Sequence, residues 1–170
     1  RGDDGRQSLV LSSRGDIEGE LRVDGTVTDQ QWRGSLAPTR LQTPLGEWTL
    51  SEAIGLRGSV AEETLSLEAH CWRQQYAQLC PGQWSLGRDG AGSAQLDADL
   101  TILQDLLPRD VEVQGDLRVA LNARWEEGAS VQLQADAQTG AVTITQHYEE
   151  GQTATFGWDY ADIGLAYAGE

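Results

Sequence analysis

Residues 111–125 read VEVQGDLRVALNARW, and their side chains alternate between two kinds. The odd positions, from Val111 to Trp125, are apolar or glycine, whereas the even positions are mostly charged or amide side chains. A helix would spread the apolar side chains around its axis, but an extended strand places them all on one face. We therefore predict one long strand here, or two strands joined at Gly115 by a bend or bulge.

The same alternation recurs on both sides of this stretch. It covers residues 17–23, 65–71, 96–100, 131–137 and 142–146. In the second of these runs Cys71 falls in the apolar set. Turn signals lie among the runs, namely Asp24-Gly25, Pro81-Gly82, Asp89-Gly90, Glu127-Gly128, Thr139-Gly140 and Glu150-Gly151. The pattern predicts an all-β chain, an antiparallel meander of roughly a dozen strands joined mostly by tight turns.

One stretch has a different period. Residues 101–107, TILQDLL, carry apolar side chains three and four positions apart and are followed by Pro108. We expect a short helix of one or two turns here, with Thr101 as its cap and Pro108 as its stop.

Composition excludes several classes of function. The chain has 170 residues, with 12 basic and 27 acidic side chains and a formal net charge of −15. Such a chain repels nucleic acid and has no basic patch for an anionic membrane surface. It also has no apolar run near the roughly 20 residues that a membrane-spanning helix needs. We expect a single domain over residues 1–170 and, because residue 1 is Arg, a segment of a longer protein.

The two cysteines, Cys71 and Cys80, fit neither a CxxC redox pair nor a four-ligand zinc site. Their spacing is within reach of a disulfide across a hairpin. We predict that disulfide, and with it an oxidising compartment such as the periplasm.

No enzymatic motif stands out. The two histidines, His70 and His147, are not part of an HExxH sequence, and there is no nucleophile elbow or phosphate-binding loop before a helix. We therefore expect no catalytic residue, no metal and no cofactor.

A sheet with one apolar and one charged face occurs in three common architectures: a closed sandwich, a barrel, or a curved open sheet that holds a ligand on its apolar side. The short aliphatic side chains and the single Phe mildly favour an open surface over a tightly filled core. The irregular placement of the six tryptophans argues against a membrane barrel.

Several strings resemble the TamB family, the translocation and assembly module subunit of bacteria. They are Glu68-Ala69-His70-Cys71-Trp72, Ala77-Gln78-Leu79-Cys80, Pro81-Gly82-Gln83-Trp84, Ala94-Gln95-Leu96, Leu103-Gln104-Asp105-Leu106-Leu107-Pro108 and Val113-Gln114-Gly115-Asp116-Leu117. The resemblance covers residues 65–125, and the flanks match only in their alternation.

The resemblance implies a periplasmic segment of an inner-membrane-anchored protein, with its sheet folded into an open hydrophobic trough, a β-taco. It also implies anterograde phospholipid transport to the outer membrane, with acyl chains shielded in the groove, a role in outer-membrane protein assembly, and a TamA-like barrel as partner. The membrane anchor would lie outside this chain, so we expect a central or C-terminal piece.

On this reading thirteen aliphatic side chains line the lipid groove, and each acyl methylene buried against them gains about 0.8 kcal/mol. They are Leu65, Leu67, Leu96, Leu100, Val111, Val113, Leu117, Val119, Leu121, Val131, Leu133, Val142 and Ile144. One alternative is a scaffold whose sheet edge pairs with strands of nascent outer-membrane proteins without carrying lipid. Another is a spacer with a closed core.

Overall fold

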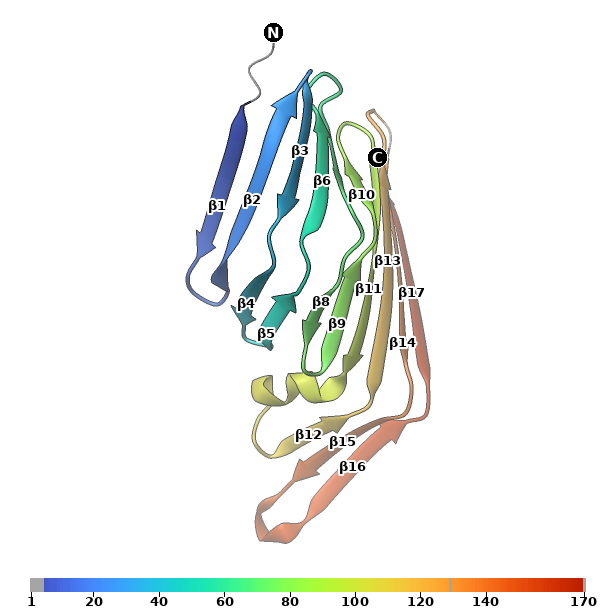
Figure 1. Ribbon diagram of the computed structural model, residues 1–170. Helices are drawn as coiled ribbons and strands as arrows, with labels where there is room; N and C mark the ends of the chain where they lie inside the picture. The colour runs from blue at the N-terminus through green and yellow to red at the C-terminus, as the bar shows by residue number, and fades with distance from the viewer. Residues whose placement is uncertain (1–4, 129, 170) are drawn as a thin grey trace.

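The computed structural model describes residues 5–128 and 130–169, and within them the chain is almost entirely antiparallel β-sheet. The sheet consists of rows, each of one or two strands, that follow one another along the chain from β1 at one edge to β17 at the other (Figure 1). The first strands are β1 (Arg6–Ser13), β2 (Glu18–Thr28), β3 (Gln31–Leu36), β4 (Thr39–Thr43), β5 (Gly46–Leu50), β6 (Ile54–Ser59), β7 (Thr64–Leu67), β8 (Trp72–Gln74), β9 (Ala77–Pro81) and β10 (Trp84–Leu86). The remainder are β11 (Gly90–Asp99), β12 (Val111–Gln114), β13 (Asp116–Trp125), β14 (Val131–Thr139), β15 (Val142–His147), β16 (Thr153–Trp158) and β17 (Ala161–Gly169).

Four rows of the sheet are each made of two short strands that lie end to end. In these rows β3 is followed by β4, β5 by β6, β7 by β8, and β9 by β10. The four rows lie between the unbroken strands β2 and β11. The interruptions, residues 37–38, 51–53, 68–71 and 82–83, are neighbours across the sheet and form a line that we call the crease. Irregular residues of this kind increase the local twist and bend of a sheet. The meander is therefore confirmed, with more strands than predicted because the crease divides four rows.

The crease corrects two local predictions. Residues 65–71 do not form one strand, because β7 ends at Leu67 and β8 begins at Trp72 with the opposite phase. Cys71 consequently does not share the apolar face of Leu65 and Leu67. Pro81-Gly82 also fails to reverse the chain, since it lies in the crease between β9 and β10.

Asp24-Gly25 is not a turn either. Both residues lie within β2, and Gly25 is buried because the indole of Trp32 occupies the space where its side chain would be. Glycine is required at position 25, but the requirement comes from the Trp32 ring and not from a turn. The signals at Asp89-Gly90 and Glu127-Gly128 do fall where the chain reverses.

The last three rows bend sharply and continue as the small sheet β12-β15-β16. The strand predicted over residues 111–125 is therefore two strands, joined by a bend at Gly115, whose φ is +142°. Only glycine adopts this conformation readily. The bend was one of the two possibilities that the sequence left open.

A short 3-10 helix, η1 (Leu100–Leu106), closes the angle between the two sheets. The predicted helix at 101–107 is thus confirmed, but its cap is Asp99 and not Thr101, because the Asp99 carboxylate accepts a hydrogen bond from the Thr101 backbone N–H at 2.8 Å. A second, three-residue 3-10 turn, η2 (Glu149–Gly151), precedes β16.

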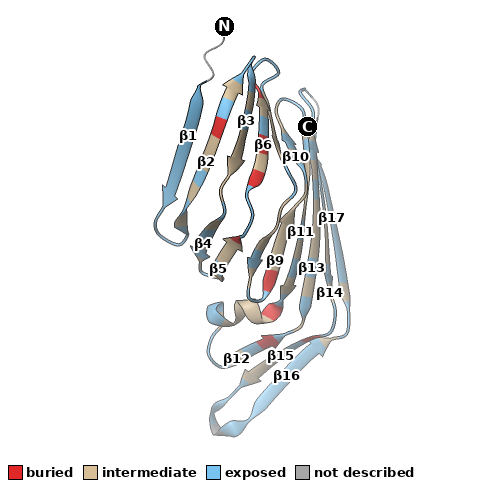
Figure 2. Ribbon diagram, in the orientation of Figure 1, coloured by how far each residue is buried: buried red, intermediate tan, exposed pale blue. Residues whose placement is uncertain are grey.

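The small core lies beneath η1. Leu100, Val113 and Val142 are buried there, with Leu103, Leu107, Leu117, Ile144 and Trp158 packed around them. Elsewhere in the described part of the sheet, the buried apolar residues are Leu50, Ile54, Leu56 and Ala77, on β5, β6 and β9 (Figure 2). The architecture is therefore an open sheet stabilised by its hydrogen-bond ladders, by this corner and by a few buried side chains in its middle rows.

Candidate functional site: the apolar face of the sheet

One row of side chains shows how the strand register builds a continuous apolar face. Leu79 of β9 pairs with Leu96 of β11, Leu96 with Val119 of β13, Val119 with Ala137 of β14, and Ala137 with Ile163 of β17. Paired residues in antiparallel strands point to the same side of a sheet. We call the side that carries this row the apolar face, and the opposite side the polar face.

The apolar face is open toward the β17 edge. Leu133 is 38% exposed and Leu165 is 67% exposed, although both point to the same side as Leu96. In a closed sandwich a second layer would bury such side chains. Contiguous exposed apolar patches on folded proteins commonly mark sites for a ligand or a partner.

Seven of the thirteen predicted groove residues lie on the apolar face of the large sheet, together with Val131 at its end. They are Leu65, Leu67, Leu96, Leu117, Val119, Leu121 and Leu133. Most of these side chains are half-buried, and Leu133 and Val131 are exposed. The strand register thus brings residues far apart in sequence onto one continuous surface.

Four others belong to the corner under η1. Leu100, Val113 and Val142 are buried, and Ile144 packs against them. Protein side chains already cover these residues, so their position favours a role in the core. Val111 lies half-buried on β12 nearby.

Several side chains of the apolar face are not among the thirteen predicted groove residues. Ile163, Leu165 and Tyr167 of β17 are among the most exposed large apolar residues, and Leu9 and Leu11 extend the face onto β1. Their alternation was hidden in β17 because the intervening positions are Asp162, Gly164 and Ala166, of which only the first is charged. A search for alternation in size, and not only in polarity, would have found them.

All six tryptophans also lie on this side of the two sheets. Trp32, Trp84 and Trp125 are near one end of the large sheet, Trp48 and Trp72 are nearer the other end, and Trp158 packs against the η1 core. Aromatic rings supply large apolar contact area.

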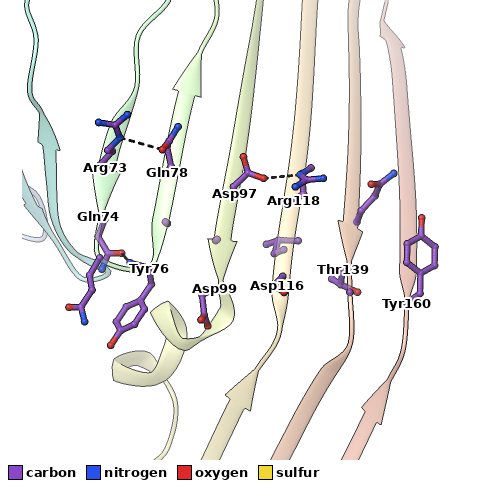
Figure 3. A pocket seen from close by; sticks show the side chains of 16 residues that line it. Arg73, Gln74, Tyr76, Gln78, Asp97, Asp99, Asp116, Arg118, Thr139 and Tyr160 are labelled. Carbon is purple, nitrogen blue, oxygen red and sulfur yellow. Dashed lines mark hydrogen bonds and ion pairs between the residues drawn. The ribbon is translucent and has the colours of Figure 1, made fainter.

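The polar face carries ion pairs and amides in register across the strands. Arg118 Nε donates to Asp97 Oδ1 at 2.8 Å, and Arg73 Nε donates to Gln78 Oε1 at 3.3 Å (Figure 3). The hydrogen bond from Arg118 to Asp97 raises the pKa of the guanidinium. These residues line a shallow hollow of about 680 Å³. Arg118 and Asp97 form an exposed ion pair and Arg73 is bonded to a neutral amide, which suits a solvated surface.

Two further groups at the lower end of this hollow have shifted pKa values. The hydrogen bonds from the Thr101 hydroxyl and backbone N–H lower the pKa of Asp99. The hydrogen bond of Tyr160 to Asp162, at 3.0 Å, raises the pKa of the phenol. Both shifts favour the protonation states that these groups already have near neutral pH.

The predicted disulfide between Cys71 and Cys80 is present, with an S–S distance of 2.06 Å. It joins the crease residue Cys71 to β9, and Cys80 stands opposite Gln95 on the polar face. The amide of Gln78 on the same face lies against the two sulfurs. The bond therefore fastens two rows of the sheet at the crease and leaves the apolar face free.

Within residues 5–128 and 130–169, no group of three or more His, Cys, Asp or Glu side chains is arranged to hold a metal ion. The described part also contains no helix of the length and apolarity needed to cross a bilayer.

The fold and its face define a class: an open, curved antiparallel sheet with one exposed apolar side and one charged side. The chain belongs to the TamB family, because the family model described as "TamB, N-terminal domain" matches residues 1–170. That description disagrees with our expectation of a central or C-terminal piece.

A curated relative is the translocation and assembly module subunit TamB of Haemophilus influenzae (strain ATCC 51907 / DSM 11121 / KW20 / Rd), which is 24% identical over 150 residues. The match covers 85% of this chain and 12% of the relative. The chain therefore spans about an eighth of that protein's length. No solved structure matches the chain significantly.

Proposed function

We propose that this segment shields phospholipid acyl chains on its apolar face during transport toward the outer membrane. The observation that carries the proposal is the row from Leu79 to Ile163, which crosses five strands without a polar side chain and ends at Ile163, whose side chain is exposed. Each methylene buried there contributes about 0.8 kcal/mol. The contacts are not directional, so a chain can slide along the face.

The polar face supports the same proposal. Its charged side chains, with a formal net charge of −15 for the chain, keep the outside of the trough in water and oppose adsorption to anionic membranes. A lipid carrier needs this combination, because it must hold acyl chains without inserting into a bilayer. No catalytic step or cofactor is part of the proposal.

The cellular setting is proposed by family membership. The relative is named as a subunit of a translocation and assembly module, so we place this chain in such a module, with a TamA-like outer-membrane barrel as partner and a role in outer-membrane protein assembly. The disulfide suits the oxidising periplasm. An inner-membrane anchor would be supplied by other parts of the protein.

A photo-crosslinkable amino acid at Val119 of the full-length protein tests the proposal directly. We expect lipid adducts, identified by mass spectrometry of the irradiated protein. Leu121→Arg should abolish them, because it places a charge on the apolar face beside the probe. Ala120→Arg is the matched control, since Ala120 is adjacent in β13 but points to the polar face. Lipid adducts that persist in Leu121→Arg would contradict the proposal.

The edge strand β1 supports a second candidate, a scaffold that pairs with strands of nascent outer-membrane proteins. All eight residues of β1 are exposed, and β1 pairs only with β2 among the described strands. A free edge of this kind is a template for another strand.

Proline scanning separates the second candidate from the first. Successive backbone N–H groups point to opposite edges, so one of Leu9→Pro and Val10→Pro removes an outward donor while the other disturbs the pairing with β2. The outward one should reduce client binding and leave lipid adducts at Val119 unchanged. If it reduces neither, the edge is not used.

A further inference from the structure

Three indoles rest on glycines at the end of the apolar face formed by the turns near residues 29–30, 60–63, 87–89 and 126–128, which we call the loop end. Trp32 covers Gly25 and Gly34, Trp84 covers Gly92, and Trp125 covers Gly90. A Cβ atom built on any of these four glycines would overlap the ring above it. Each ring can therefore lie where it does only because the residue beneath it is a glycine.

Two of the rings are also fixed by their N–H groups. Trp84 Nε1 donates to the Ser93 carbonyl at 2.8 Å, and Trp125 Nε1 donates to the Gly87 carbonyl at 3.1 Å. Side chains in strands ordinarily stand roughly perpendicular to the sheet. These indoles instead lie over the neighbouring backbone, with their polar atom turned to it and an apolar ring surface left uncovered.

The space that the rings leave is seen beside Trp32. A hollow of about 400 Å³ lies there, with Gly58, Leu65 and Leu86 in its lining and the turn at residues 60–63 at its rim. An indole that stood upright at this end would project into the path of any ligand on the apolar face.

We infer that Trp32, Trp84 and Trp125 form the floor of the acyl path at the loop end, and that the glycines beneath them are positioning residues that keep this end open. The inference rests on the proposed function, because it names the surface over which the acyl chains pass. An indole face contacts methylene groups by dispersion without directional bonds, so an acyl chain can slide over it.

Gly92→Val in the full-length protein tests the inference. The valine displaces the Trp84 ring into the groove, and Ala123, which pairs with Gly92 in the next strand, lies beside it. With a photo-crosslinkable amino acid at Ala123, we expect a loss of lipid adducts of about tenfold or more. This is the effect on binding of losing contact with about two methylene groups of the acyl chain.

Two further variants separate a blocked path from a damaged fold. Gly164→Val is the matched control, since a Cβ there meets only Asp136 Oδ1, at 3.5 Å, on the polar face of β17. It should leave the adducts unchanged. Gly92→Val combined with Trp84→Ala should restore them, because the displaced ring is no longer present.

The outcomes distinguish this inference from the function on which it rests. Adducts that persist in Gly92→Val, or a double variant as poor as the single one, overturn the inference and leave the proposed function standing if the wild-type protein still captures lipid at Val119. A wild-type protein without lipid adducts at both Val119 and Ala123 overturns the proposed function, and the inference with it.

Discussion

Leu50 and Ile163 stand in one row of side chains on the same face of one sheet, yet Leu50 is 2% exposed and Ile163 is 58% exposed. Thr49 pairs with Arg73, so Leu50 stands opposite Trp72, which continues the row through Leu79 to Ile163. The difference arises from the curvature of the sheet. Side chains in its middle strands cover one another, whereas those of β17, which we call the β17 wall, face open space.

Leu50→Ala should therefore lower the free energy of unfolding by about 2–5 kcal/mol, the usual range for deleting a buried leucine side chain. Ile163→Ala should change it by less than about 1 kcal/mol, because an exposed side chain leaves no cavity. Urea denaturation followed by circular dichroism measures both. Equal losses would mean that the β17 wall is packed against protein in solution.

The bend at Gly115 makes a second prediction. A Cβ at this position would lie 2.7 Å from the Ala141 carbonyl oxygen, and the φ of +142° is unfavourable for any other residue. We expect Gly115→Ala to destabilise the protein by about 1–3 kcal/mol. Gly140→Ala, at a neighbouring bend with no atom within 4 Å of the added carbon, is the control and should be nearly neutral. A neutral Gly115→Ala would show that the corner relaxes easily.

The cap of η1 predicts a dependence on pH. Hydrogen bonds from Thr101 lower the pKa of Asp99 below its ordinary value of about 3.8, so the folded state prefers the carboxylate. The resulting stabilisation is present above that ordinary value and is lost as the pH falls through the lower folded pKa.

Unfolding measured between about pH 2 and pH 5 should therefore show a small loss of stability at the acid end that Asp99→Asn does not share. Asp99→Ala should cost about 1 kcal/mol near neutral pH through loss of the cap itself. Identical pH profiles for the wild type and Asp99→Asn would contradict the role of the carboxylate.

The disulfide should act locally. Replacing Cys71 and Cys80 together by serine should cost about 2–3 kcal/mol on the chain-entropy estimate. Hydrogen exchange should become faster in β8 and β9, which the bond joins to the crease, before it does so in β14. Uniformly faster exchange along the sheet would show that the bond supports the whole fold and not the crease alone.

Much of the fold could be predicted from period-two alternation, because the register of an antiparallel sheet repeats what the sequence displays. The short helix before Pro108 could be predicted as well, whereas the bend at Gly115 was one of two possibilities for residues 111–125. The crease was not, since an interrupted row depends on its neighbours across the sheet, and nothing local distinguishes Pro81-Gly82 in the crease from a turn.

The candidate site was predicted only in part for the same reason. Alternation identified Val119 and Leu121 as apolar-face residues. It could not separate this open surface from the corner that buries Val113, because the residues of both regions alternate in the same way. The contact of Trp32 with Gly25 joins two strands, so Gly25 was interpreted as a turn residue. Partners across the sheet are settled by the register and not by the order of the residues.

The crease also has a consequence for how such chains change over evolution. An added or deleted residue within residues 37–38, 51–53, 68–71 or 82–83 alters no paired position on either side of the interruption, whereas the same change inside β11 or β13 would invert every side chain beyond it. Length variation among related sequences should therefore concentrate along this line, and an aligned gap there would mark the same four rows in a relative whose structure is unknown.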